Sequence, residues 1–240
     1  MIMSKPDLTL LIGPTEKAAM RFRSLLKQKA GPLAKKGIVA PDWNHVRLYA
    51  ACAEADEVGV LRYRRGLDNP LVQQTLNAEF TTLFEKELPA LEDTHVVLAS
   101  AQLGNLLFAP SEIERLHGLL SPYFRKIRIV AHVEEQARLL AQHYTYAVLE
   151  GRHTSLDQEI ALAGQDDWWA GALAMRGKTD PYIGLFDDIH APPFWLDFKG
   201  LLDLWETSFG NGNVSLHPLD LVALNSDAGM DALCEALQMV

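Results

Sequence analysis

The feature that most constrains the fold is an apolar, strand-like run that turns at a glycine directly into a helix. Residues 8–12 form this run, and Gly13 and Pro14 interrupt it. Apolar residues with helical spacing follow at Ala18, Ala19, Phe22, Leu25 and Leu26. This order is typical of the first unit of a phosphate-binding α/β domain, because N–H groups at the start of a helix favour an anion. We therefore expect the site of the protein at this turn.

The turn itself lacks the residues of a P-loop. Its sequence is Gly13-Pro14-Thr15-Glu16-Lys17-Ala18-Ala19-Met20. The second glycine and the Lys-Ser/Thr pair that would contact phosphate and metal are missing. The N-terminal unit therefore indicates a nucleotide-binding ancestry more firmly than a nucleotide-binding activity.

Length, charge and cysteine content narrow the class of protein. A chain of 240 residues fits one large α/β domain, so we predict a single domain over 1–240. The net charge of −9 argues against a nucleic-acid partner and against an anionic membrane partner. Residues 1–7 carry no signal segment, and no apolar run reaches the roughly 18 residues of a spanning helix. We expect a cytoplasmic protein in which Cys52 and Cys234 are reduced core thiols, with a disulfide as the alternative.

Strands and helices alternate along most of the chain. Strands are predicted at 38–40, 95–100, 126–133 and 214–218, and helices at 42–55, 69–91, 111–121, 134–150, 198–209 and 230–239. Ser111 with Glu114 forms a capping-box pattern, and a short basic turn is predicted at Lys35-Lys36-Gly37, after Gly31-Pro32. The alternation predicts an α/β fold, a three-layer α/β/α domain with a central, mainly parallel sheet and the first strand in its middle. The segment 152–195 breaks the rhythm and is expected to form a helical or irregular lid.

In sheets of this kind, ligands bind at the carboxyl ends of the strands, here at 13–17, 100–102 and 133–136.

Four segments of the chain, in order, resemble bacterial sulfotransferase-family proteins. The first is 10–14 with 37–41 and His45, the second is 97–102, and the third is 112–151. The fourth is 196–205 with 209–210 and 214–218. The resemblance implies a P-loop-like α/β fold. It also implies transfer of a sulfuryl group from 3′-phosphoadenosine-5′-phosphosulfate to a hydroxyl or amine, on a small-molecule or glycan acceptor.

The same resemblance assigns the donor-binding positions. They are Gly13, Pro14, Thr15, Glu16, Lys17, Ala18, Ala19, Glu134, Arg138 and Gln142. The lysine of the family loop falls at Glu16, and the arginine that pairs with the 3′-phosphate falls at Glu134, with its partner serine at Gln142. Acidic side chains repel a phosphosulfate, and glutamate lacks the bidentate fork of arginine. The resemblance therefore implies a donor site that is impaired or altered.

Two cations near these positions can compensate. Lys17 lies one residue beyond the position of the family lysine, and it can substitute for that lysine only if the loop is reshaped. Arg138 lies one helical turn after Glu134, where an i,i+4 ion pair is the simpler interpretation. If the protein is an enzyme, Lys17, Ser100 and Arg138 rebuild an anion site, and His45 with Lys17 supplies the catalytic groups. The alternative for His45 is a solvated residue at the start of a helix.

Other chemistry-bearing residues have simpler structural interpretations. Asp187, Asp188 and His190 have the chemistry of metal ligands but lack a second cluster, so no metal is expected. Trp168 and Trp169 either stack on a sugar or base or anchor a lid. Six cations form either an anion-binding lobe or a solvated surface: Lys35, Lys36, Arg47, Arg62, Arg64 and Arg65.

Three hypotheses about function remain open at this point. The first is a sulfotransferase-like transferase. The second is a non-catalytic binding or scaffolding protein whose protein partner contacts the aromatic segment 168–182. The third and weaker one is a relative that uses another nucleotide or sugar donor.

Overall fold

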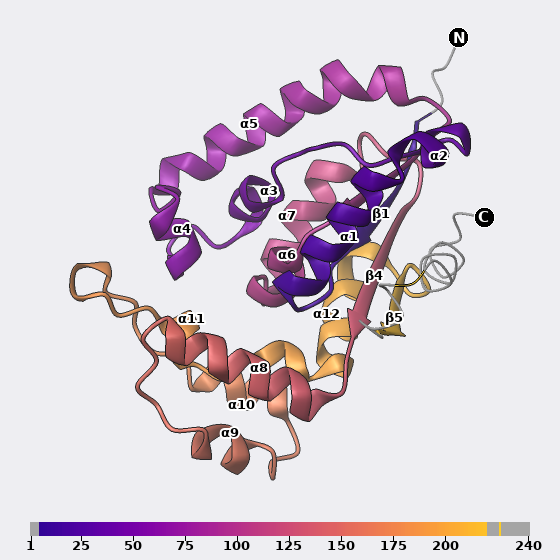
Figure 1. Cartoon of the computed structure of the whole chain (residues 1–240). Helices are drawn as coiled ribbons and strands as arrows, with labels where there is room; N and C mark the ends of the chain where they lie inside the picture. Colours follow the sequence, from indigo (N-terminus) through magenta and orange to yellow (C-terminus); the bar gives the residue numbers. More distant parts are fainter. Residues whose placement is uncertain (1–4, 220–225, 227–240) are drawn as a thin grey trace.

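The computed structural model describes residues 5–219 and residue 226. Its strands are β1 (Asp7–Leu11), β2 (Ile38–Val39), β3 (His95–Ala99), β4 (Ile127–Val133) and β5 (Val214–Pro218). They form one sheet in the order β2-β3-β1-β4-β5, and every neighbouring pair is parallel. The predicted parallel sheet with a central first strand is confirmed (Figure 1).

The helices occupy both faces of the sheet and a lobe beyond its carboxyl ends (Figure 1). They are α1 (Glu16–Gln28), α2 (Ala30–Lys35), α3 (His45–Cys52), α4 (Val60–Arg64), α5 (Pro70–Glu87), η1 (Leu88–Leu91), α6 (Ala101–Leu106), α7 (Pro110–Leu120), α8 (Gln136–Leu149), α9 (Asp157–Leu162), α10 (Trp168–Ala174), η2 (Pro181–Ile183), α11 (Asp187–His190), η3 (Phe194–Leu196) and α12 (Phe198–Phe209).

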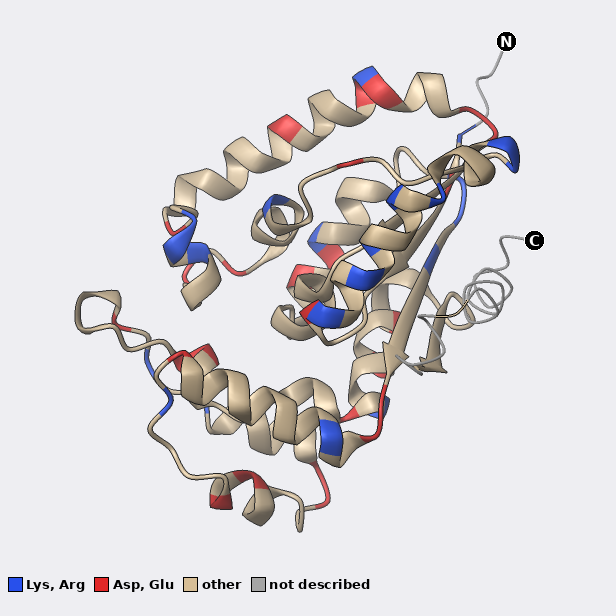
Figure 2. Cartoon of the chain, in the orientation of Figure 1, with Lys and Arg blue, Asp and Glu red and all other residues tan. Residues whose placement is uncertain are grey.

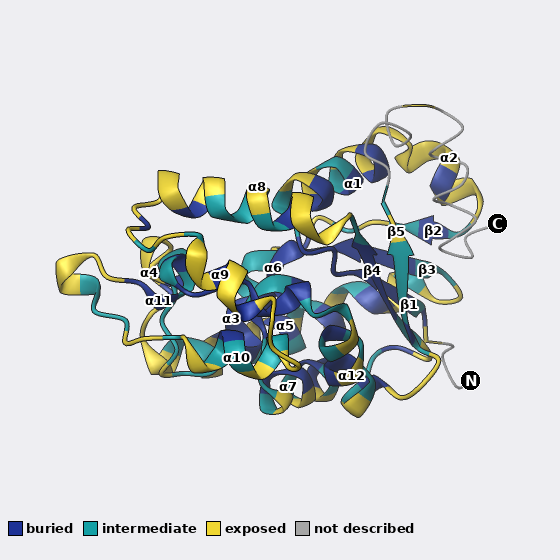
Figure 3. Cartoon of the chain, turned by 90° about the horizontal axis from the view of Figure 1, so that it is seen from below, coloured by how far each residue is buried: buried dark blue, intermediate teal, exposed yellow. Residues whose placement is uncertain are grey.

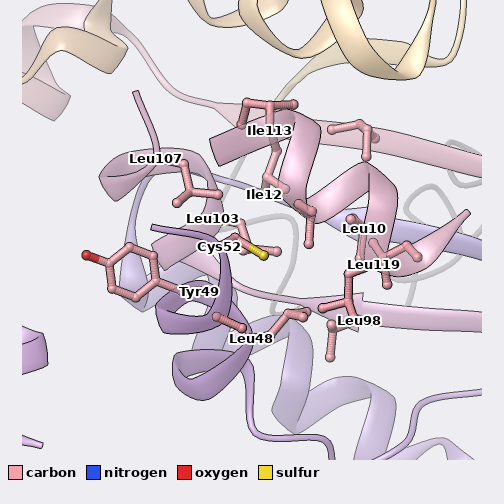
Figure 4. Close-up of a cluster of buried hydrophobic side chains, with 14 of the residues drawn as sticks. Leu10, Ile12, Leu48, Tyr49, Cys52, Leu98, Leu103, Leu107, Ile113 and Leu119 are labelled. Carbon is pink, nitrogen blue, oxygen red and sulfur yellow. The ribbon is translucent and has the colours of Figure 1, made fainter. Parts of the chain in front are cut away.

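Alternation along β1 sends side chains to two different cores, as the two-residue period of a strand requires. Leu10 and Ile12 face the larger core, which α3, α5, α6, α7 and α12 complete. Leu11 faces the smaller core, which α1 and α2 cover. Figure 4 shows Leu10, Ile12 and Leu98 packed among side chains of α3, α6 and α7. The strands β1, β3 and β4 are therefore largely buried between two helical layers, whereas the edge strand β5 is mostly of intermediate burial (Figure 3).

Helix α1 forms where the sequence predicts it. The Thr15 hydroxyl caps its start by accepting a hydrogen bond from the Ala18 N–H at 3.3 Å. Its five apolar positions with helical spacing are all buried: Ala18, Ala19, Phe22, Leu25 and Leu26. The helix therefore begins at the carboxyl end of the central strand, which fixes the place of the site.

Two local predictions are wrong for identifiable reasons, one at the start of α3 and one at the start of α7. The helix predicted from residue 42 begins at His45, because the Asn44 side chain caps it through the Arg47 N–H at 3.1 Å. Gly31-Pro32 lies within the short helix α2, which the sequence pattern did not predict, and the basic turn predicted at 35–37 follows this helix at residues 36–37. Helix α7 is capped by the Glu112 carboxylate, not by Ser111 with Glu114.

The Glu112 carboxylate is buried and accepts three backbone hydrogen bonds. The donors are the N–H groups of Glu54 at 2.9 Å, Phe108 at 2.7 Å and Ala109 at 2.9 Å. Glu112 therefore joins the start of α7 to the segment that follows α3, a contact that the local pattern of a capping box does not reveal.

The segment 152–195 forms a lobe of short helices, α9, α10, η2, α11 and η3, beside α8 (Figure 1). Leu162 of α9 and Ala172 of α10 pack with Leu139 of α8 in a separate small core. The role of a lid that the sequence analysis gives to this segment stays a prediction. The predicted helix 230–239 and Cys234 lie outside the described residues, whereas Cys52 is a free thiol in the larger core.

Within the described residues, no helix combines the length and the apolar composition required to cross a bilayer.

Candidate functional site

The turn after β1 is held from one side by α6. The Ser100 N–H donates to the Leu11 carbonyl at 2.9 Å, and the Asn105 side-chain amide donates to the Pro14 carbonyl at 2.9 Å. Between them, Gly104 lies so close to the turn that an added Cβ would stand 1.9 Å from the Ile12 carbonyl oxygen. The shape of the turn therefore depends on a helix that the sequence pattern did not predict.

The first residue of α1 places a carboxylate at the site. Glu16 forms an ion pair with Arg23, two helical turns further along α1, and accepts a hydrogen bond from the Gln102 side chain at 2.8 Å. Arg23 also donates to the Ala99 carbonyl, at the end of β3, at 3.1 Å. Because a helix N-terminus favours negative charge, Glu16 is itself the anion that this end of α1 stabilises.

Two hollows flank the first turn of α1, and Glu16 and Met20 line both. The first, which we name the loop hollow, lies between the turn, α6 and α8, and has a volume of 560 Å³. Lys17 and Gln142 line it. The second, which we name the arginine cleft, lies between α1, α3 and α4, and has a volume of 830 Å³.

His45 lies in the arginine cleft with Arg23, Arg65 and Asp42. Burial lowers the pKa of His45, and the charge of Arg23 lowers it further. A neutral imidazole at neutral pH has the protonation state that a general base needs. Lys17, however, does not line this cleft, so the two predicted catalytic residues lie on different sides of the start of α1.

The predicted basic lobe does not form a single surface. Arg62 is buried and donates to the backbone carbonyls of Leu67 at 3.1 Å and Glu57 at 2.6 Å. Arg47 and Arg64 form ion pairs with Glu79 and Glu150. Lys35 ends α2 and Lys36 follows it, and this helix lies at the opposite end of the molecule from α4 (Figure 1). The arrangement is that of separate contacts, and Arg65, which lines the arginine cleft, is the member whose charge lowers the pKa of His45.

Glu134 stands between β4 and α8, in an acidic connection, and the first turn of α8 then carries one basic residue, Arg138 (Figure 2). It lines a third hollow, beside β5, together with Glu135 and His217, and its Oε1 is buried without a hydrogen-bond partner among the described residues. Glu135 caps α8 through the N–H of Arg138 at 2.9 Å. The Arg138 side chain is exposed and, within 5–219, forms no ion pair with Glu134.

The three groups of the predicted anion site therefore do not converge. Lys17 lines the loop hollow, but Arg138 does not. Ser100 is fully buried and lies 3.3 Å from the Gln102 side-chain carbonyl, to which its hydroxyl donates. The position that corresponds to the family serine, Gln142, does line the loop hollow.

Sequence reasoning missed three site residues. Arg23 is separated from Glu16 by two helical turns, a spacing that was visible in the sequence. Asn105 belongs to the unpredicted helix α6. His143 follows Gln142 on α8, packs edge-on to Trp195 at 5.7 Å, and has its pKa lowered to about 4, mainly by burial and then by Arg152.

The acidic and aromatic residues of the lobe have structural partners. Asp187 binds Arg176 at 2.6 Å, while Asp188 accepts from the Val60 N–H at 3.1 Å, and burial raises the pKa of Asp188 to about 6. Among the described residues, no three potential ligands are grouped so as to hold a metal. The Trp168 indole donates to the Pro193 carbonyl at 2.9 Å, so this side chain helps to anchor the lobe.

His132 makes the region next to the turn sensitive to acid. It is buried against Phe22 at 4.8 Å, its backbone carbonyl adjoins Gly13, and burial lowers its pKa to about 4. A base with a depressed folded pKa stabilises the fold above its unfolded pKa, and this stability is lost as pH falls. Between pH 7.5 and pH 5, His132 should account for a loss of about 2 kcal/mol.

Urea denaturation at both pH values measures this loss. The His132→Leu variant should lose about 2 kcal/mol less than the wild type between the two conditions. An equal pH dependence in both proteins would show that His132 is not the group responsible.

Comparison with known proteins supports the fold. No protein-family model matches the sequence. Among solved structures, the chain is similar to the crystal structure of a sulfotransferase from Alicyclobacillus acidocaldarius, with a TM-score of 0.53 and 12% sequence identity. The match covers 98% of this chain and 81% of that one. The protein therefore has a sulfotransferase-like α/β fold.

Proposed function

We propose that this protein is a non-catalytic binding protein on a sulfotransferase-like fold, and that it does not use 3′-phosphoadenosine-5′-phosphosulfate as a donor. The observation that carries the proposal is the carboxylate of Glu16 at the start of α1. It is held in place by Arg23 and Gln102. A phosphate or sulfate group bound there would meet a fixed negative charge, and its nearest arginine is already paired.

The residues of the turn do not fit this polyanionic donor. Lys17 is the one cationic side chain that lines the loop hollow within the described part of the chain. Glu134 stands where the resemblance places an arginine for the 3′-phosphate, and Arg138 does not line the loop hollow. Sulfuryl transfer, like phosphoryl transfer, depends mainly on positioning and on stabilising charge. Without those cations, the activity should be lost rather than reduced.

A transferase assay tests the proposal. Wild-type protein is incubated with the radiolabelled phosphosulfate and a mixture of hydroxyl-bearing and amine-bearing acceptors, with an active sulfotransferase as the positive control. We expect no labelled product above the rate without protein. Turnover that requires the protein would overturn the proposal.

A catalytic alternative is favoured by one observation, the neutral His45 between Arg23 and Arg65 in the arginine cleft. In that case His45 acts as a general base, and a reshaped loop uses Lys17. Turnover that is abolished in both Lys17→Ala and His45→Ala would support this alternative. Turnover that survives either change would remove that residue from the mechanism.

A further inference from the structure

We propose that the loop hollow binds a small, uncharged and mainly apolar molecule that has a hydrogen-bond donor, a hydroxyl or an amine N–H, at one end. This inference rests on the proposed function, since it requires the hollow to be available in the absence of the phosphosulfate. It assigns a class of ligand to the site from the volume, the lining and the charges of the hollow.

The hollow has the size and the lining of a ligand pocket. Its volume of 560 Å³ lies within the range of about 300–1,000 Å³ that small-molecule sites occupy. Leu139 and Trp195 form an apolar floor and are almost fully buried. Met20 and Tyr146 stand at the rim, where 59% and 60% of their surfaces are exposed. A ligand with an apolar body would cover these exposed rim side chains, which favours its binding.

The charges of the hollow favour an uncharged ligand. Glu16 is already paired with Arg23, and a pKa of about 4 keeps His143 neutral at neutral pH. Lys17 is exposed at the mouth and is one cation in a largely apolar site. One exposed ammonium adds little binding energy for an anion, because water screens it. An anionic group placed deeper would lose its hydration without gaining a partner.

Asn105 and His143 determine which kind of polar group the ligand carries. Both residues also line a smaller cavity of 90 Å³, so they lie where this cavity and the loop hollow adjoin, which we take as the inner end of the hollow. The Asn105 amide nitrogen donates to the Pro14 carbonyl, which fixes the orientation of the amide. Its Oδ1 is then an acceptor, and it is buried without a hydrogen-bond partner among the described residues, as is His143 Nε2.

Buried polar atoms without partners are costly, at about 1–3 kcal/mol each. A hydroxyl or amine of a ligand that reaches the inner end of the hollow can donate to Asn105 Oδ1 after a small movement of that side chain. A ligand without a donor would leave this acceptor unpaired, so the site should prefer molecules that carry one.

Fluorescence titration tests the proposal with two matched probes. N-phenyl-1-naphthylamine is uncharged and apolar and carries one N–H donor, and 8-anilino-1-naphthalenesulfonate has the same ring system with an added sulfonate. For the wild type, we expect saturable binding of the uncharged probe at least tenfold tighter than that of the sulfonate. No saturable binding of the uncharged probe, or tighter binding of the sulfonate, would overturn the proposed ligand class.

Two variants of α8 locate the binding site. Tyr146→Glu places a carboxylate at the rim of the hollow, whereas Leu149→Glu places one on the same helix at a side chain that is 78% exposed and does not line it. Because both positions are exposed, both variants should fold, which circular dichroism verifies. Tyr146→Glu should weaken the binding of the uncharged probe at least tenfold, and Leu149→Glu should weaken it less than twofold. Equal effects would place the probe elsewhere and contradict the proposal.

Calorimetric titration of the same protein with 3′-phosphoadenosine-5′-phosphate separates this inference from the proposed function. Binding of that nucleotide would overturn the proposed function, and with it the availability of the hollow. A result in which neither the nucleotide nor the uncharged probe binds would leave the proposed loss of the donor intact and overturn only the ligand class.

Discussion

Replacing Gly104 with alanine is expected to lower the free energy of unfolding by about 3 kcal/mol, at the upper end of overpacking effects. The Cβ of alanine would lie 1.9 Å from the Ile12 carbonyl oxygen and 3.0 Å from its carbonyl carbon. Both are backbone atoms of Ile12, directly after the central strand β1, so they cannot avoid the new methyl group by a side-chain rotation. Helix α6 must move, and the hydrogen bonds that it makes to the turn must lengthen. Chemical denaturation measures the loss.

Gly118→Ala is the matched control. Gly118 lies inside α7, is exposed, and has no atom within 4 Å of an added Cβ. Alanine should therefore stabilise the protein there by about 0.5–1 kcal/mol through its higher helix propensity. A Gly104→Ala variant as stable as the wild type would show that α6 does not pack as closely on the turn as in this structure.

Replacing Arg152 with methionine is expected to cost about 3–5 kcal/mol, because it leaves the Glu159 carboxylate buried without its partner. The side chains of both residues are fully buried and form an ion pair, and Arg152 also lies over the Tyr144 ring at 5.0 Å. Glu159 belongs to α9, so the pair fastens the lobe to the end of α8. Denaturation curves of the wild type and of Arg152→Met give the difference.

Two controls separate charge from packing. Arg64→Met removes one member of the exposed pair with Glu150 and should cost less than about 1 kcal/mol. The double change Arg152→Met with Glu159→Met should recover most of the stability, because no buried charge then remains unpaired. A double variant that is no more stable than Arg152→Met alone would show that the cost lies in packing and not in charge.

Much of the fold could be predicted from the sequence because its information is local. The apolar run before Gly13 and the helical spacing after it determine β1 and α1 without reference to the rest of the chain. Asn69 and the long apolar pattern that follows likewise predict α5. The short helices were missed because tertiary contacts stabilise them: α6 is six residues long and rests on the turn after β1.

The candidate site could be predicted only in part. The resemblance aligns two donor-binding cations of the family with Glu16 and Glu134. The hydrogen bond between Glu16 and Gln102, however, joins residues 86 positions apart and cannot be inferred from spacing. The sequence places both His45 and Lys17 near the start of a helix. It does not reveal that the two side chains line different hollows, because this depends on how the helices pack. Ser100 is fully buried directly before α6, where its hydroxyl donates to Gln102, and the sequence pattern did not predict this helix.

In the function that we propose, the carboxylate of Glu16, paired with Arg23, takes the place of the donor's anionic groups at the start of α1. Isothermal titration of the wild-type protein with 3′-phosphoadenosine-5′-phosphate tests it most directly, because this nucleotide carries the phosphates without the transferable group. We predict no saturable heat at nucleotide concentrations up to the millimolar range. A saturating isotherm with a micromolar dissociation constant would contradict the account.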